Sequence, residues 1–296
     1  MNDIVIETTG LRKLFEGRAA VDGLDLKVEA GSIFGFLGRN GAGKTTTIRL
    51  LLGFLKAADG EARLFGDPVT GPGGGVELRR RIGYVSENKH LYPFMTVRQI
   101  IGLTRPFFPG WRDDLERRYL EMFDLPPNRK VSALSKGMRT GLMLLLAISH
   151  GAELLILDEP TEGLDPAVTE AVLRELVALS AAEGTTIFFS SHQLAEVEQI
   201  ADHVAIIDRG RAVVSGGLDD LKVQYQRLRV VFQREPARVS WVEGAENVRQ
   251  EGRTVSILAS HNVEAIVEQA RSLPGASVER YPVSLKEIFL EHARNN

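Results

Sequence analysis

The sequence predicts an α/β fold with a mainly parallel sheet, a helical insertion and a small α+β domain at the carboxyl-terminal end. Short β-rich runs alternate with helical patterns from Ile4 to about Ser215, as in strands joined by crossover helices. Two of the runs, LLILD and TIFFSS, are almost continuously apolar, which is typical of strands buried on both faces of a sheet. After Gly216–Gly217 the pattern changes to short strands mixed with helices, which indicates a second domain.

The first domain is expected to span residues 1–216. Its strands are expected at Ser32–Leu37, Ile82–Ser86, Leu154–Leu157, Thr185–Ser190 and His203–Ile207. Helical patterns lie between these runs, notably at Lys44–Leu55 and Pro166–Ala182. Strands separated by helices favour parallel pairing, because each crossover returns the chain to the same end of the sheet.

From about residue 88 to residue 150 the β-rich runs are replaced by a helical pattern. Prolines interrupt this pattern at Pro93, Pro106, Pro109, Pro126 and Pro127. Proline ends or kinks helices, so several short helices are expected rather than one long one. We interpret this stretch as a helical subdomain inserted into the sheet domain.

The second domain is expected to span residues 217–296. Its strands are expected at Leu228–Phe232, Thr254–Leu258 and Ser277–Arg280, and its helices at Val263–Arg271 and Ser284–Ala293. No cluster of site-like residues stands out in it. A dimerisation or stabilising role is therefore expected, and a ligand-sensing role stays open.

Composition excludes several classes of site. The 296 residues are 44% apolar and 25% charged, as in an ordinary globular protein. A formal net charge of -3 provides no basic field for nucleic acid, so no nucleic-acid partner is expected. The chain has no cysteine, which excludes disulfides, zinc–thiolate sites and thiol nucleophiles. The first residues show no secretory signal, and no apolar stretch approaches the ~20 residues that a membrane-spanning helix needs.

A phosphate-binding loop follows the first predicted parallel strand. Residues 38–45, GRNGAGKT, fit the pattern G-x-x-x-x-G-K-[ST], and Thr46 follows at once. Its glycines let backbone N–H groups surround a polyphosphate, and the helix that begins there adds favourable dipole charge. The residues predicted to bind nucleotide here are Gly38, Asn40, Gly41, Gly43, Lys44, Thr45 and Thr46.

An accidental match is the alternative, but a strand before the loop and a helix after it make accident rare. We therefore expect the fold of a P-loop NTPase that binds ATP and Mg²⁺. Lys44 is expected to contact the outer phosphates, and the Thr45 hydroxyl is expected to ligate the metal.

Two carboxylates, Asp158 and Glu159, follow the apolar strand Leu154–Leu157. Side chains alternate along a strand, so the two are expected to point in different directions. We assign Asp158 to the magnesium site and Glu159 to the general base that polarises the attacking water. Acids that simply end a strand at the surface are common, and only the phosphate-binding loop favours catalysis here.

Three further motifs identify the kind of P-loop ATPase. LSKGM at residues 134–138 precedes the acidic pair, GLD at 163–165 follows it, and SSH at 190–192 closes the next strand. Together with the loop, in this order from about residue 4 to residue 215, they resemble the nucleotide-binding subunits of ATP-binding cassette (ABC) transporters. The segments YVSENKHLYPFMTVRQ and LSKGMRTGL and the tail YPVSLKEIFLEHA resemble exporter-type cassettes that pair with type-2 ABC permeases.

The resemblance implies roles for single residues. LSKGM matches a signature whose commonest form is LSGGQ, so Ser135 and Gly137 are expected to contact the nucleotide of an opposite subunit. His192 resembles the switch histidine at the γ-phosphate, and Asp165 resembles the residue that links the two sites of a dimer. Phe15 matches the aromatic residue that stacks on adenine.

Two positions depart from the family pattern. Glu87 stands where the family usually has a glutamine that contacts magnesium, so an oxygen ligand is kept and a charge is added. Arg39 replaces the usual proline of the phosphate-binding loop, and the sequence offers no account of it.

The resemblance also implies partners. Two copies, or this chain and a related ATPase subunit, are expected to dimerise head to tail around ATP, at the cytoplasmic face of a membrane and joined to a transmembrane permease. The permease is expected to dock near Asn88–Trp111, on aromatic residues that could instead pack the insertion against the sheet. These are Tyr92, Phe94, Phe107, Phe108 and Trp111. The alternative function is a soluble ABC-type ATPase acting on DNA or ribosomes, which the single cassette and the absence of a heptad run or basic patch disfavour.

Overall fold

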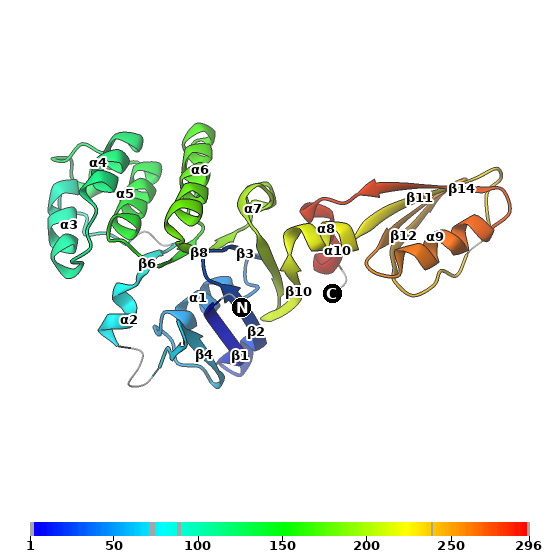
Figure 1. The fold of residues 1–296 in the computed structure, drawn as a ribbon, viewed down its shortest axis with the longest axis horizontal. Coiled ribbons are helices and arrows are strands. Elements are labelled where there is room, and N and C mark those ends of the chain that lie inside the picture. Colours follow the sequence, from blue (N-terminus) through cyan, green and yellow to red (C-terminus); the bar gives the residue numbers. More distant parts are fainter. Residues whose placement is uncertain (1–2, 71–74, 88–89, 238, 295–296) are drawn as a thin grey trace. The chain divides into compact units, whose positions relative to one another are not determined.

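The computed structural model describes the whole chain except residues 1–2, 71–74, 88–89, 238 and 295–296. The chain divides into two compact units, Met1–Ser215 and Gly216–Asn296 (Figure 1). Among the described residues, no helix combines the length and the apolar character that crossing a bilayer requires.

The central element of the first unit is a six-stranded sheet with the order β10-β9-β3-β8-β7-β6. Its strands are β3 (Ile33–Gly38), β6 (Ile82–Val85), β7 (Leu154–Asp158), β8 (Thr186–Ser191), β9 (His203–Asp208) and β10 (Arg211–Gly217). β3 pairs in parallel with β8 and β9, and β7 pairs in parallel with β6 and β8. Every residue of β3, β7 and β8 is buried, as their apolar sequences predict.

The register of this sheet brings three motifs to one edge. Leu37 pairs with Ser191 across β3 and β8, and Asp158 pairs with Ser190 across β7 and β8. Parallel strands end on the same side, so the segments that follow β3, β7 and β8 meet there. The phosphate-binding loop, the acidic pair and the SSH motif are therefore neighbours in space.

A second sheet in the first unit is not among the predicted strands. It is antiparallel, with the order β2-β1-β4-β5. Its strands are β1 (Ile4–Phe15), β2 (Arg18–Glu29), β4 (Asp59–Leu64) and β5 (Asp67–Pro68). Buried side chains of this sheet, such as Ile6 and Leu26, share one apolar core with Phe34 and Phe36 of the parallel sheet. Left-handed glycines and β-bulges within β1 and β2 interrupt the alternation of charged and apolar residues, which obscures these strands in the sequence.

Helices of the first unit follow the predicted pattern with changed ends. They are α1 (Lys44–Leu51), α2 (Val76–Arg80), α3 (Val97–Thr104), η1 (Arg105–Phe107), α4 (Asp113–Met122), η2 (Val131–Ala133), α5 (Lys136–Ser149), α6 (Pro166–Glu183) and α7 (Leu194–Ile200). α1 stops at Leu51 rather than at the expected Leu55, because the chain reverses at Gly53 with a left-handed φ of 69°.

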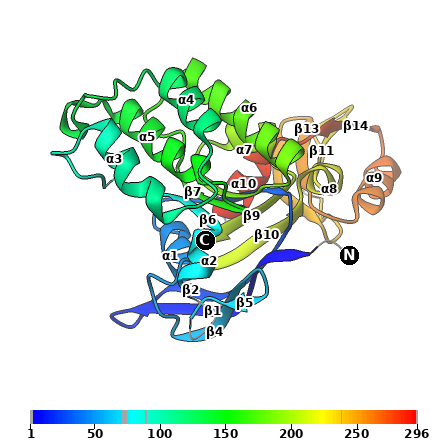
Figure 2. The ribbon, with the colours of Figure 1, turned by 60° about the vertical axis from the view of Figure 1, so that its left-hand side comes forward.

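The expected helical insertion is present. Figure 2 shows α3, α4 and α5 gathered into one group, with α6 beside them. Residues 88 and 89, where the subdomain was expected to begin, lie outside the described residues.

The second unit is an α+β structure with its own core. Its antiparallel sheet has the order β12-β13-β11-β14. Its elements are α8 (Leu218–Gln224), β11 (Gln226–Phe232), β12 (Ala245–Glu251), β13 (Thr254–Ala259), α9 (Val263–Ser272), β14 (Ala276–Pro282) and α10 (Leu285–Arg294). Alternate residues of β11 and β13, such as Leu228 and Ile257, pack against Ile266 and Val267 of α9. One face of this sheet is therefore buried under a helix.

Candidate active site

The phosphate-binding loop needs glycine at two positions for reasons visible in its backbone. Gly41 and Gly43 have left-handed φ values of 83° and 112°. A Cβ on Gly43 would lie 2.4 Å from the carbonyl oxygen of Ala20, so a side chain is excluded there. The chain then enters α1 at Lys44, whose first turn offers free N–H groups to an anion.

This loop borders a cavity of about 190 Å³ at the carboxyl edge of the sheet. Its lining residues are Ala20, Arg39, Asn40, Gly41, Gly43, Lys44, Thr45, Thr46, Glu87, Asp158 and Glu159. The structure thus brings together most of the predicted nucleotide-binding residues, the three predicted metal ligands and the predicted base. Arg39, which has no sequence-based role, borders the same cavity with an exposed side chain.

Lys44 is buried beside the cavity. Its Nζ donates to the carbonyl oxygen of Gly38 at 2.7 Å and lies 3.7 Å from Glu159 Oε1. Both charged side chains of this pair are only 8% exposed, so their attraction is weakly screened by solvent. Gly38 therefore acts in the site through its carbonyl group, which orients the Lys44 ammonium.

Asp158 has one satisfied oxygen and one orphaned oxygen. Its Oδ1 accepts a hydrogen bond from Ser190 Oγ at 2.6 Å. Its Oδ2 is buried and has no hydrogen-bond partner among the described residues. Burial raises the pKa of this carboxyl, and the Glu87 and Glu159 carboxylates add to the shift.

The residues around Asp158 suit a magnesium ion. The Thr45 hydroxyl lies 3.4 Å from Glu87 Oε2, and both residues line the cavity with Asp158. A buried carboxylate oxygen without a partner is costly, and a nearby cation offsets that cost. Hydroxyl and carboxylate oxygens are ligands that Mg²⁺ prefers, completed by water and phosphate oxygens.

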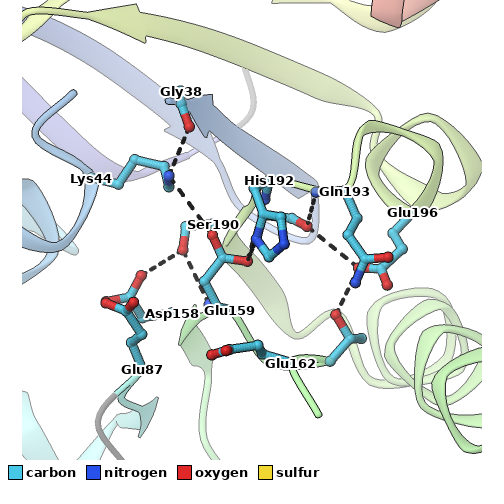
Figure 3. Close-up of polar contacts among 12 residues, drawn as sticks. Gly38, Lys44, Glu87, Asp158, Glu159, Glu162, Ser190, His192, Gln193 and Glu196 are labelled. Carbon is cyan, nitrogen blue, oxygen red and sulfur yellow. Dashed lines mark hydrogen bonds and ion pairs between the residues drawn. The ribbon is translucent and has the colours of Figure 1, made fainter. Parts of the chain in front are cut away.

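Glu159 faces the opposite way, toward Lys44 and His192 (Figure 3). Its Oε2 lies 2.7 Å from His192 Nδ1 and also accepts from the His192 backbone N–H at 3.3 Å. The divergence from Asp158 has a backbone cause as well as strand alternation, because Glu159 has a left-handed φ of 52°. Ser190 holds this turn, since its carbonyl and hydroxyl oxygens both lie 3.2 Å from the Glu159 N–H.

Six predicted residues do not line this cavity. Gly38 and His192 contact lining residues, Lys44 and Glu159 respectively, and the other four have local contacts elsewhere. Ser135 caps α5 by accepting from the Met138 N–H, and Asp165 caps α6 by accepting from two N–H groups. Gly137 packs so closely on the loop after β7 that a Cβ would lie 3.0 Å from the Gly163 carbonyl oxygen. Phe15, at the end of β1, is half exposed, with Lys13 Nζ 5.3 Å from its ring centre.

Lys136, the residue that departs from the signature sequence, has a local partner. Its Nζ lies 2.6 Å from Glu162 Oε1, and its aliphatic stem covers Gly163. The ion pair therefore joins the start of α5 to the loop that follows the acidic pair. In the sequence, the spacing of 26 residues hides this contact.

Sequence reasoning gave no role to three residues that organise the site. Ser190 binds both carboxylate residues, and Thr161 and Glu196 form a buried hydrogen bond of 2.7 Å beside them. The SSH motif pointed to Ser190, but a glutamate inside a short helix gives no signal of burial.

One family model and several known proteins are similar to this chain. A family model described as "ABC transporter" matches residues 21–162. An uncharacterised ABC transporter ATP-binding protein of Bacillus subtilis, YhaQ, is 34% identical over 94% of this chain and 95% of that protein. The bacitracin transport ATP-binding protein BcrA of Bacillus licheniformis is 40% identical over 74% of this chain and 71% of its own length. A Nod factor export ATP-binding protein of Cupriavidus metallidurans is 31% identical over 97% and 96% of the two chains.

Solved structures agree in fold. One described as the ATP-binding subunit of an ABC transporter is 29% identical, with a TM-score of 0.67 over 74% of this chain and 92% of that one. A dimeric ATP-binding cassette bound to ADP and Pi shares the fold at 21% identity, with a TM-score of 0.63 over 72% of this chain and 98% of that one.

Proposed function

This chain belongs to the ABC transporter family, as an ATP-binding subunit that hydrolyses ATP to drive export by a separate membrane permease, and from that premise we propose which of its residues bind ATP, hold Mg²⁺ and carry out hydrolysis. The family relatives are transporter subunits, which favours this function over a soluble ATPase acting on DNA or ribosomes. The predicted fold class and family are confirmed by the same comparisons.

The phosphate-binding loop holds the triphosphate of ATP. Backbone N–H groups of residues 40–46 and the start of α1 surround the phosphates, and the Lys44 ammonium neutralises the outer ones. Mg²⁺, when bound by Thr45, Glu87 and Asp158, supplies charge neutralisation for the β- and γ-phosphate oxygens. Ser190 keeps the Asp158 carboxylate aimed at this site through its hydroxyl group.

Hydrolysis is assigned to Glu159. A water oxygen attacks the γ-phosphorus, the bond from that phosphorus to the ADP oxygen breaks, and the water proton goes to the Glu159 carboxylate. His192 orients this carboxylate through the 2.7 Å contact at Nδ1 and leaves its other ring nitrogen for the phosphate. The observation that carries the assignment is the Glu159 side chain held between Lys44 and His192 at the cavity.

A second subunit completes the site in this proposal. Ser135, Gly137 and Asp165 lie outside the cavity of their own chain, on helix starts whose N–H groups suit an anion. In a head-to-tail homodimer, or a heterodimer with a related ATPase subunit, they would meet the nucleotide of the other chain. Phe15 would stack on the adenine of its own chain. ATP then closes the dimer and hydrolysis opens it.

The permease would bind the helical insertion at the cytoplasmic face of the membrane. Of the five aromatic residues expected there, Tyr92, Phe94 and Phe107 are exposed. Phe108 stacks on His150, and Trp111 donates to Glu116, so these two pack the insertion internally. We therefore narrow the proposed docking surface to the three exposed rings, which the permease would cover.

The chain can also be divided into two domains with separate roles. We propose residues 1–216 as the ABC ATPase domain, with its helical subdomain at about 88–150. Residues 217–296 form a domain with its own core, which suits a dimerisation or stabilising role.

The direct test replaces Glu159 by glutamine. Glu159→Gln should bind ATP like the parent, lower kcat by about 10²- to 10⁴-fold because the base is lost, and trap an ATP-bound dimer. The measurements are steady-state phosphate release, ATP titration and size-exclusion chromatography with Mg-ATP.

The variant Lys44→Ala tests the role of Lys44 in ATP binding separately from the hydrolysis step. It should weaken ATP binding by about 10- to 100-fold, because a charged hydrogen bond to phosphate is lost. Arg49→Ala, on the exposed side of α1, is the matched control and should bind normally. Parental turnover by Glu159→Gln would refute the base assignment.

A further inference from the structure

Glu196 is a buried carboxylate that has no part in the mechanism above. It lies in the first turn of α7 and is 8% exposed. Its Oε2 accepts hydrogen bonds from Thr161 Oγ1 at 2.7 Å and from Ser191 Oγ at 3.4 Å. We infer that Glu196 is the positioning residue that keeps His192 in reach of Glu159, an inference that rests on the proposed function of that pair.

The two partners of Glu196 belong to the two segments that carry the pair. Thr161 follows Glu159 by two residues, and Ser191 directly precedes His192. One carboxylate oxygen thus ties together segments that lie about 30 residues apart in the chain. In Figure 3, Glu196 lies on the opposite side of the pair from Lys44.

The same contacts fix the backbone on both sides of His192. The Ser191 hydroxyl donates toward Glu196 and accepts from the Gln193 N–H at 2.9 Å. The Ser191 hydroxyl therefore holds the backbone on both sides of His192, although the His192 ring itself is half exposed. A ring of that exposure needs such support to stay oriented.

Glu196 complements the contact that Ser190 makes at the opposite end of the pair. Ser190 joins the two segments at Asp158 and at the Glu159 N–H. Among the described contacts, removal of the Glu196 contact would leave the distance of 2.7 Å from Glu159 to His192 with support mainly from the Ser190 end. Displacements of about 1 Å at such a site can lower rates by about 10²-fold.

Burying the Glu196 carboxylate at this position costs free energy. Burial raises the pKa of Glu196, because a charged group is removed from water, and the neighbouring Glu159 carboxylate adds to the rise. An apolar side chain would fill the same space more cheaply, as replacements of buried charged groups show in other proteins. The cost is consistent with a role in the site beyond packing.

The test compares Glu196→Ala, Glu196→Gln and Thr161→Val. Glu196→Ala and Thr161→Val should each lower kcat by about tenfold or more, with KM for ATP unchanged, since neither residue lines the phosphate cavity. Glu196→Gln keeps an acceptor oxygen and should recover most of the lost kcat. The double variant Glu196→Ala with Thr161→Val should be no slower than the slower single variant, because both remove one contact.

Glu170→Ala is the matched control. It removes a carboxylate of α6 that holds Gln199, on the same helix α7, at 3.0 Å, and should keep parental kcat. ATP-binding stoichiometry counts the folded sites in every preparation, so kcat is expressed per folded site.

Two results overturn the inference and can be told apart from failure of the proposed function. Parental kcat in Thr161→Val or Glu196→Ala, alongside an inactive Glu159→Gln, rejects positioning by Glu196 alone. Equal loss in Glu196→Gln and Glu196→Ala rejects the acceptor role. A fully active Glu159→Gln removes the base assignment and, with it, the premise of the inference.

Discussion

At the scale of single residues, the site depends on one unusual backbone conformation. Glu159 has φ 52°, a left-handed value that residues other than glycine rarely adopt and that costs about 1–3 kcal/mol. Its N–H lies 3.2 Å from two acceptors on Ser190, which hold the turn in place. The turn directs the carboxylate of Glu159 toward Lys44 and His192, while Asp158 lines the cavity with Thr45 and Glu87, the other proposed metal ligands. The left-handed φ of Glu159 adds to strand alternation in separating the proposed base from the proposed metal ligand.

A prediction at the same scale concerns His150. This side chain is buried and stacked on Phe108 with ring centres 4.2 Å apart, and burial lowers its pKa to about 4. An unfolded histidine titrates near 6.5, so the unfolded state takes up the proton first as the pH falls. The stability that depends on the neutral ring is complete above about pH 6.5 and is lost as the pH falls toward 4.

His150→Phe should remove this acid sensitivity and keep a ring against Phe108. Between pH 7 and pH 5, the parent should lose about 2 kcal/mol of unfolding free energy more than the variant does. Urea denaturation at a series of pH values measures the difference. Parallel pH profiles for the two proteins would contradict the prediction.

At the scale of elements, α4 of the helical insertion is joined to α6 by ion pairs. Arg118 Nη2 lies 2.6 Å from Glu175 Oε2, and Arg112 lies 3.1 Å from Glu183. Only the Glu175 carboxylate is buried, with 5% of its side chain exposed. The first pair should therefore matter more for stability, because exposed pairs contribute little.

Arg118→Ala tests this difference. It leaves the Glu175 carboxylate buried without its cation and should lower the unfolding free energy by about 1–2 kcal/mol, discounted because Arg118 itself is half exposed. Arg117→Ala is the matched control, since its Nε donates to a carbonyl of its own helix at 3.2 Å, and it should cost under about 0.5 kcal/mol. Chemical denaturation of both variants decides the matter, and equal effects would argue against a special role for Glu175.

At the scale of the whole molecule, the contacts described above for the candidate site join residues of the first unit. The cavity and the contacts of Glu159 involve residues from Ala20 to His192, and the second unit has a separate core around Leu228 and Ile257. Nucleotide binding should therefore not require residues beyond the last strand of the six-stranded sheet.

A chain that ends at Gly217, where β10 is complete, tests this independence. Its Kd for ATP should stay within about twofold of the parent, because no binding contact is removed. Dimer formation with Mg-ATP should weaken if the second unit has the proposed dimerisation role. Isothermal titration measures the first and sedimentation the second. A folded, shortened protein that no longer binds ATP would show that the units are coupled.

The sequence by itself determined the parts of this protein that depend on neighbouring residues. Strands, helices and the phosphate-binding loop follow from periodicity and glycine spacing, and the motif order indicated the ABC family, which the comparisons confirm. The roles of Lys44, Asp158 and Glu159 remain predictions that the geometry supports. The first antiparallel sheet was missed, because β-bulges and the left-handed glycines Gly10 and Gly23 interrupt the alternation of charged and apolar residues along its strands.

Only the tertiary structure decided which distant groups meet. Glu196 reads in the sequence like any glutamate on a helix surface, yet it is buried against Thr161, 35 residues away. Lys136 reads as a departure from a motif, yet it pairs with Glu162. Sequence patterns encode local preferences and the face that each element buries. Hydrogen bonds between loops depend on the register of β7 beside β8, which exists only once the sheet has formed.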